Sequence, residues 1–143
     1  MSINEIQDEI VEEFSFFDDW MDKYEYLISL GKNLPLIAAQ YKDEDHLIKG
    51  CQSQVWLHAA DSDGAVDFTA DSDAVITKGI IGLLIRVLNG QPAKDIASAE
   101  LYFIDQIGLK EHLSPNRSNG LLSMVKQMKM YGLALAAKKT SNG

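Results

Sequence analysis

The sequence predicts one α+β domain in which helices surround a small antiparallel sheet. The chain has 143 residues, of which 46% are hydrophobic, and this suits a single domain with its own core. Residues 54–60 and 65–70 are rich in strand-forming residues and flank an Asp-Gly turn, which predicts a hairpin. Apolar residues recur at helical spacing on both sides of this hairpin. No repeat or internal boundary is visible, so we expect one domain over residues 1–143.

Two amphipathic helices are expected near the N-terminus. Ser2 and Glu5 have the spacing of a capping box, and the helical apolar pattern continues through 3–14. A second helix is expected to begin at Ser15, with aspartates near its positive end, and to stop at Gly31. Its apolar face is expected to consist of Phe16, Phe17, Trp20, Tyr24, Leu27 and Ile28.

The remaining elements follow from turn and cap signals. A short strand is expected at 47–49, ahead of the hairpin. The next helix, with cap candidates at 71–73, is apolar on most sides and should be central, ending at Asn89-Gly90. Further helices are expected at 92–97, at 100–107, and from a Ser114-Pro115 start over 117–138, with 140–143 frayed.

Charge is distributed unevenly along the chain. The formal net charge is −8 and the pI about 4.7, which argues against a nucleic-acid partner. Nine acids and one base lie within residues 1–25, whereas the chain from His112 onward has five bases and no acid. Two interpretations stay open: solvated acidic and basic helix faces that are neighbours in the fold, or charge-steered docking on a protein partner.

The N-terminus lacks the basic and apolar regions of a signal peptide, and the longest apolar stretch, 79–85, is too short to span a bilayer. We therefore expect a cytoplasmic protein without a membrane partner. The chain has a single cysteine, Cys51. One thiol cannot form an internal disulfide, a four-cysteine zinc site or a cysteine-only iron–sulfur site, and no metal site is expected.

Cys51 is the candidate reactive group. It lies in a predicted loop, where functional groups are common, and its neighbours are Lys49, Gly50, Gln52, Ser53 and Gln54. The neutral polar neighbours can hydrogen-bond a thiolate or a persulfide, and Lys49 offers a charge that would lower the thiol pKa. A buried, inert cysteine is the structural alternative.

Three interpretations of Cys51 remain open from the residues alone. A thiol enzyme would need a histidine base, and the candidates His46, His58 and His112 lie in no recognisable signature. A sulfur relay needs only one thiol and benefits from the absence of a second, because no internal disulfide can then resolve a persulfide. The third possibility is an interaction module whose thiol is inert.

Ordered blocks of the chain resemble the SufE/CsdE family. The central block, 46–57, contains Gly50-Cys51-Gln52-Ser53-Gln54-Val55-Trp56. It is followed by Asp71-Ser72-Asp73-Ala74 with Lys78-Gly79, and by Leu113-Ser114-Pro115-Asn116-Arg117-Ser118-Asn119-Gly120-Leu121. The upstream pattern also matches, with Trp20, Lys23-Tyr24, Leu27-Ile28, Leu30-Gly31 and Leu34-Pro35, so the resemblance covers about residues 15–138.

This resemblance implies a sulfur-transfer protein that is not itself an enzyme. Such a protein accepts sulfane sulfur from a cysteine desulfurase of the SufS or CsdA type, stimulates it, and passes the sulfur to an iron–sulfur scaffold of the SufB type. Pyridoxal phosphate is expected on the desulfurase, and no cofactor on this chain. The implied fold is that of the IscU/NifU-type scaffold proteins, an α+β sandwich with a three-stranded antiparallel sheet. We expect a monomer or a weak dimer.

The resemblance also assigns roles to individual residues. Cys51 is the persulfide-forming acceptor, Gly50, Gln52, Ser53 and Gln54 shape its loop and partner contacts, and Asp73 and Arg117 border the site. Structural alternatives are open for three neighbours, because Asp71 and Asp73 can cap a helix and Arg117 can form a first-turn salt bridge. We expect Cys51 to be largely buried or shielded in the free protein, with a loop that moves on docking.

Overall fold

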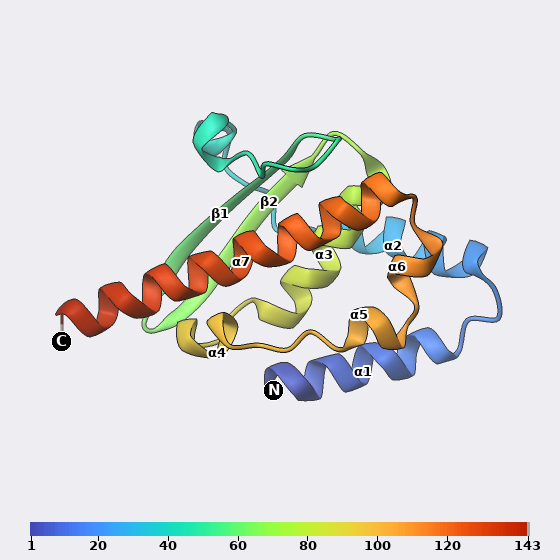
Figure 1. Cartoon of the computed structure of the whole chain (residues 1–143), viewed down its shortest axis with the longest axis horizontal. Coiled ribbons are helices and arrows are strands. Elements are labelled where there is room, and N and C mark those ends of the chain that lie inside the picture. Colours follow the sequence, from blue (N-terminus) through green and yellow to red (C-terminus); the bar gives the residue numbers. More distant parts are fainter. Residues whose placement is uncertain (143) are drawn as a thin grey trace.

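The computed structural model describes residues 1–142, and for residues 139–142 the backbone alone. In chain order the elements are α1 (Ile3–Ser15), α2 (Trp20–Lys32), the 3₁₀ turns η1 (Ala39–Tyr41) and η2 (Glu44–His46), β1 (Val55–Ser62), β2 (Ala65–Ser72), α3 (Val75–Leu88), α4 (Ala93–Ala97), α5 (Phe103–Gln106), α6 (Leu109–His112) and α7 (Pro115–Asn142). The architecture is α+β, mostly helical, with one antiparallel hairpin (Figure 1).

Helix α3 forms the centre of the core, as its apolar pattern predicts. It packs against α1, α2, β2 and α7. In Figure 1, α7 crosses in front of the hairpin while α1 runs along the opposite side of the molecule. The buried residues of α3 are Thr77, Gly79, Ile80, Ile81, Leu83, Leu84, Ile85, Val87 and Leu88. The helix is hydrophobic on most sides because neighbours cover most sides.

The sheet has two strands among the described residues, and the expected three-stranded sheet is wrong. Val55 pairs with Ser72, and the register continues to Ser62 opposite Ala65. The expected third strand at 47–49 is reduced to one antiparallel bridge, Leu47 to Trp56. The cause is its length, because η2 ends at His46 and the chain turns at residues 49–50, which leaves no room for a continuous ladder.

The start of α1 is confirmed and that of α2 is not. Ser2 and Glu5 form the capping box, with the Ser2 hydroxyl accepting from Glu5 N–H at 3.1 Å. Ser15 belongs to α1, and Asp19 caps α2 by accepting from the N–H of Asp22 at 3.0 Å. Phe16 therefore lies between the two helices and is 76% exposed, so its expected place on the apolar face of α2 is wrong.

Gly31 does not stop α2, which continues to Lys32. It lies instead where α2 crosses α3, and a Cβ added to Gly31 would be 3.0 Å from the backbone nitrogen of Gly79. A Cβ on Gly79 would be 2.7 Å from the carbonyl carbon of Leu27. The two helix backbones approach this closely only because both residues lack side chains.

The C-terminal third largely follows its cap signals. The expected helix at 100–107 is shorter, and a separate turn, α6, follows because Gly108 has a φ of 70°. Helix α7 begins at Ser114-Pro115 as expected, where the Ser114 hydroxyl accepts from Arg117 N–H at 3.3 Å. It runs past Lys138; the expectation of fraying at 140–143 falls on residues whose side chains lie outside the described set.

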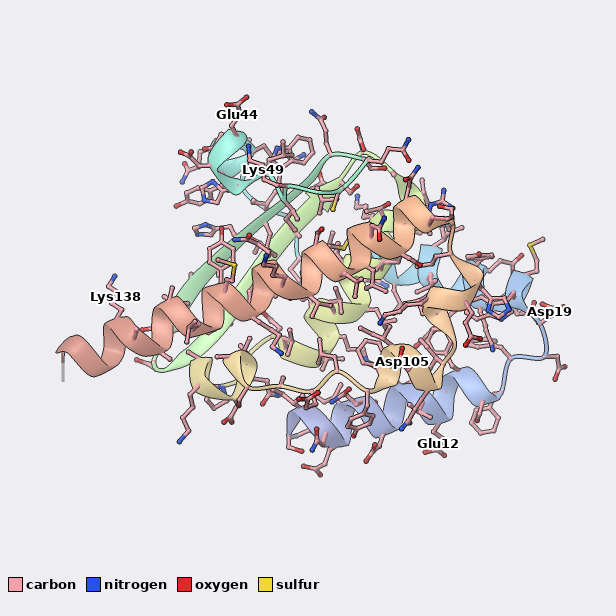
Figure 2. The ribbon with its side chains drawn as sticks, viewed as in Figure 1. Glu12, Asp19, Glu44, Lys49, Asp105 and Lys138 are labelled. Carbon is pink, nitrogen blue, oxygen red and sulfur yellow. The ribbon has the colours of Figure 1, made fainter. Side chains whose placement is uncertain are left out.

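The acidic α1 packs mainly against α3 and α5, and the basic α7 packs mainly against α4 and α3. The interpretation that their charged faces are neighbours in the fold is therefore not supported. Arg86 of α3 takes up part of the α1 charge by pairing with Glu9 at 2.8 Å and with Glu13. Figure 2 shows Glu12 directed outward from α1 and Lys138 toward the far end of α7. Within residues 1–142 no helix is long and apolar enough to cross a membrane.

Replacing Gly79 by alanine should destabilise the fold strongly. Alanine normally stabilises a helix interior by about 0.5–1 kcal/mol relative to glycine, but here its methyl group would collide with the backbone of Leu27. We expect a loss of about 1–3 kcal/mol in the free energy of unfolding, measured by urea denaturation. Gly82→Ala is the matched control, because its nearest atom, Leu30 O, is 3.3 Å away. Equal stability of the two variants would contradict the crossing.

Candidate functional site

Cys51 lies on the loop between the Leu47 bridge and β1, and this loop rests on the first turns of α7. The residue is half-buried, so its thiol is partly shielded. Its Sγ is 3.6 Å from the carbonyl oxygen of Gly120, to which it donates a weak hydrogen bond. A Cβ on Gly120 would be 3.5 Å from Sγ, so a larger side chain there would reach the thiol.

Gly50 is required by the path of the chain into Cys51. Its φ is 91°, a left-handed conformation that side chains disfavour. A Cβ at this position would also be 2.5 Å from the hydroxyl oxygen of Ser123 on α7. The glycine thus serves both the turn and the close approach of the loop to α7.

A cavity of about 320 Å³ opens beside the thiol. Three parts of the chain form it: the Cys51 loop, the first turns of α3, and α7 with the residue before it. Its lining residues are Cys51, Gln52, Ser53, Thr77, Ile80, Ser114, Asn116, Arg117, Gly120 and Met124. The lining combines neutral hydrogen-bonding groups and one cation with the apolar side chains of Ile80 and Met124.

The C-terminal end of the loop is anchored to the hairpin through Gln54. Its N–H donates to the carboxylate of Asp73 at 3.1 Å, and its carbonyl accepts from the Ser72 hydroxyl at 2.8 Å. Helix α3 is capped by Ala74 without a side-chain bond, so the interpretation of Asp73 as a helix cap is wrong. Asp71 is no cap either, because it pairs with Lys42 at 2.5 Å and with Lys78 at 3.3 Å.

The middle of the loop is connected to α7 by one exposed side-chain hydrogen bond. Asn116 donates from Nδ2 to Oε1 of Gln52, at 3.1 Å. Both residues line the cavity, so this bond crosses its rim. Gln52 is exposed and also lines the cavity, so it borders both the solvent and the space beside the thiol.

Burial raises the pKa of the Cys51 thiol above its ordinary value. The expectation that Lys49 lowers the pKa is therefore wrong; Lys49 is exposed and lies toward the η2 end of the loop in Figure 2. Arg117 is also exposed and lines the cavity. No ion pair involves Arg117 among the described residues, so the interpretation of Arg117 as a first-turn salt bridge is not supported.

Comparison with known proteins identifies the family of this chain. The family model described as SufE, Fe-S metabolism associated domain, matches residues 8–132. The chain belongs to the SufE family. The matched region contains the Cys51 loop and every residue that lines the cavity.

Similar SufE-like proteins occur in bacteria and plants. The chain is 42% identical over 135 residues to an uncharacterised SufE-like protein of Rhizobium etli, covering 91% of each chain. It is 41% identical over 131 residues to SufE-like protein 1, chloroplastic/mitochondrial, of Arabidopsis thaliana, covering 91% of this chain and 35% of that one. A hypothetical protein of Thermus thermophilus shares the fold, with a TM-score of 0.77 at 19% identity over 92% of this chain and 96% of that one.

The histidines of this SufE-family chain lie away from the thiol. None lines the cavity within the described chain. His112 stacks on Trp20 with ring centroids 3.9 Å apart. Nε2 of His46 lies 3.2 Å from Nδ1 of His58. Burial, together with the charge interaction with His46, holds the pKa of His58 below its ordinary value. No group of three or more potential ligands is arranged for a metal within residues 1–142.

The structure brings most of the predicted site residues together. Cys51, Gln52, Ser53 and Arg117 line the cavity, whereas Gly50, Gln54 and Asp73 support the loop from outside it. Sequence reasoning did not assign the other six lining residues to the site: Thr77, Ile80, Ser114, Asn116, Gly120 and Met124. The spacing of 117, 120 and 124 on a helix beginning at Ser114-Pro115 is the signal that could have found the α7 face.

The rate of alkylation of Cys51 by iodoacetamide should rise at a higher pH than the rate for free cysteine. Because burial raises the thiol pKa, the reactive thiolate is scarce at neutral pH and appears above the ordinary thiol value of about 8.5. We expect slower alkylation of the folded chain than of free cysteine at neutral pH, and a higher midpoint in the rate profile. A midpoint at or below that of free cysteine would contradict the effect of burial.

Removing the rim hydrogen bond should expose the thiol. In Asn116→Ala the Gln52 side chain loses its donor on α7, and a net bond strength of about 0.5–1.5 kcal/mol corresponds to roughly two- to tenfold faster alkylation of Cys51. Asn119→Ala, an exposed asparagine on the same helix, is the matched control. Unchanged rates in Asn116→Ala would show that this bond does not restrain the loop.

Proposed function

We propose that this SufE-family chain accepts sulfane sulfur as a persulfide on Cys51, from a pyridoxal-phosphate cysteine desulfurase of the SufS or CsdA type. It stimulates that desulfurase and delivers the sulfur to an iron–sulfur scaffold of the SufB type. One observation carries the proposal: the single thiol of a chain in this family lies beside a polar cavity large enough for an added sulfur atom.

The sulfur transfer requires one thiol on the donor protein and one, Cys51, on this chain. The Cys51 thiolate, formed by loss of its proton, attacks the outer sulfur of the donor persulfide. A new sulfur–sulfur bond forms at Cys51 as the donor bond breaks, and the donor thiolate leaves with the electron pair. Cys51 then carries the persulfide until a thiolate of the acceptor attacks its outer sulfur in the same way.

The residues that line the cavity can stabilise a persulfide on Cys51. Neutral donors from Gln52, Ser53 and Asn116 can hydrogen-bond a persulfide, and the Arg117 guanidinium compensates its negative charge. Two apolar side chains, Ile80 of α3 and Met124 of α7, also line the cavity and limit the approach of water. This protects a labile sulfur while the loop side stays open to a partner.

The alternative of a thiol enzyme has no support in the geometry. Such an enzyme requires a histidine within reach of the nucleophile. Among the described residues that line the cavity there is none, and the thiol donates to the carbonyl of Gly120. Because Cys51 has neither a base nor a lowered pKa of its own, we assign deprotonation of the thiol to the docked complex.

Incubation with a cysteine desulfurase and cysteine should add one sulfur to the chain. Intact-mass analysis is expected to show a gain of about 32 Da that a reductant removes. Cys51→Ser should show no gain and should fail to raise desulfurase turnover, although in excess it should compete with the wild-type chain for the desulfurase. Labelling that persists in Cys51→Ser, or full stimulation by that variant, would refute the proposed function.

A further inference from the structure

Two histidines outside the Cys51 cavity form a preorganised pair between η2 and β1. Nε2 of His46 and Nδ1 of His58 are 3.2 Å apart. On its other side, Nδ1 of His46 is 2.7 Å from the carboxylate oxygen of Asp43. The side chain of His46 is 20% exposed and His58 is partly buried, so the pair lies near the surface and not in the core.

Both rings are held in place by their neighbours. The ring of Tyr41 stacks on that of His58 with centroids 3.9 Å apart and an angle of 8°. Asp43 orients His46 from the other side through both its backbone N–H and its ring nitrogen. The bridge between Leu47 and Trp56 ties η2 to β1 next to this pair. The facing nitrogens therefore belong to elements that are joined by backbone pairing.

The separation of the nitrogens matches that of two ligands on one tetrahedral ion. Zinc–nitrogen bonds of about 2.0–2.1 Å at a tetrahedral angle place the two nitrogens about 3.3–3.4 Å apart and the ring centres about 5.2 Å apart. The observed values for His46 and His58 are 3.2 Å and 5.1 Å. A right-angled arrangement at the same bond lengths would bring the nitrogens to about 2.9 Å.

We propose that His46 and His58 form a binding site for a divalent ion of the zinc class. Nε2 of His46 and Nδ1 of His58 are the two protein ligands, and water completes the tetrahedron. Asp43 acts behind His46 as an orienting carboxylate, a partner that metal-bound histidines commonly have. The site is separate from the Cys51 cavity and does not depend on the proposed function.

The protonation states available to His46 and His58 are compatible with binding of the ion. Asp43 accepts from the Nδ1–H of His46, which leaves a lone pair on Nε2. His58 frees its Nδ1 by carrying its proton on Nε2 instead, so a neutral pair binds the ion without losing a proton. An additional proton shared between the rings would have to leave, and binding should weaken as the pH falls.

The test uses the chain without a histidine tag and in the Cys51→Ser form, so that neither tag nor thiol binds the ion. Zinc binding is measured by competition with a chromophoric chelator, and cobalt absorbance reports the coordination geometry. We expect one equivalent of zinc, a tetrahedral cobalt spectrum, and a zinc-dependent rise in Tm. Adding Asp43→Asn should weaken the affinity by about 10–100-fold.

Matched histidine variants decide the assignment. His46→Gln and His58→Gln should each abolish binding and the rise in Tm, whereas His112→Gln, which removes the histidine that stacks on Trp20, should retain both. Circular dichroism of each variant without metal checks that it is folded. Zinc retained in His58→Gln, zinc lost in His112→Gln, or no binding by the Cys51→Ser chain would each overturn the proposal.

Discussion

The position of Cys51 depends on how closely its loop approaches the first turns of α7. Gly50 allows this contact, because any side chain there would meet the Ser123 hydroxyl. Helix α7 is in turn held against α4 at Gly132, where a Cβ would be 2.8 Å from a methyl carbon of Ile96. Helix α7 also packs on α3, whose own position depends on the glycine crossing with α2. The shape of the cavity thus depends on a close contact at Gly50, beside the thiol, and on close contacts at glycines elsewhere in the chain.

The same contacts limit which part of the loop can move. Ile48 donates its N–H to the carbonyl of Val55 at 2.8 Å, and Gln54 is bonded on both its N–H and its carbonyl. Between these anchors only residues 49–53 are free of ladder-like bonds to the hairpin, and the bond between Gln52 and Asn116 restrains them. That bond is exposed, so a docking protein can replace it at little cost in free energy. We propose that these five residues are the part of the loop that moves on docking.

Much of the fold and part of the site could be predicted from the sequence. The capping box at Ser2, the central helix α3 and the Ser114-Pro115 start are local signals, and local physics determined them. Several of the wrong predictions concern places where distant segments meet. Gly31 is a residue type that often ends a helix, yet here it faces Gly79 where two helices cross. No local sequence pattern reveals that crossing. The single bridge at Leu47 likewise depends on tertiary contacts, as do the contacts between Asn116 and the loop.

The electrostatics of the thiol explain why transfer would require a partner. Burial alone favours the neutral thiol of Cys51, a form that resists oxidation but cannot attack a persulfide. Docking removes more water and by itself would raise the pKa of the thiol further.

The positive charge that lowers this pKa must therefore come from groups at the cavity, and two are positioned for it. Arg117 lines the cavity from the first turn of α7, and the positive end of that helix points to the same side. Once water is excluded, both interactions with a thiolate become stronger, because the local dielectric constant falls. Sulfur transfer and partner recognition would then depend on the same closed arrangement.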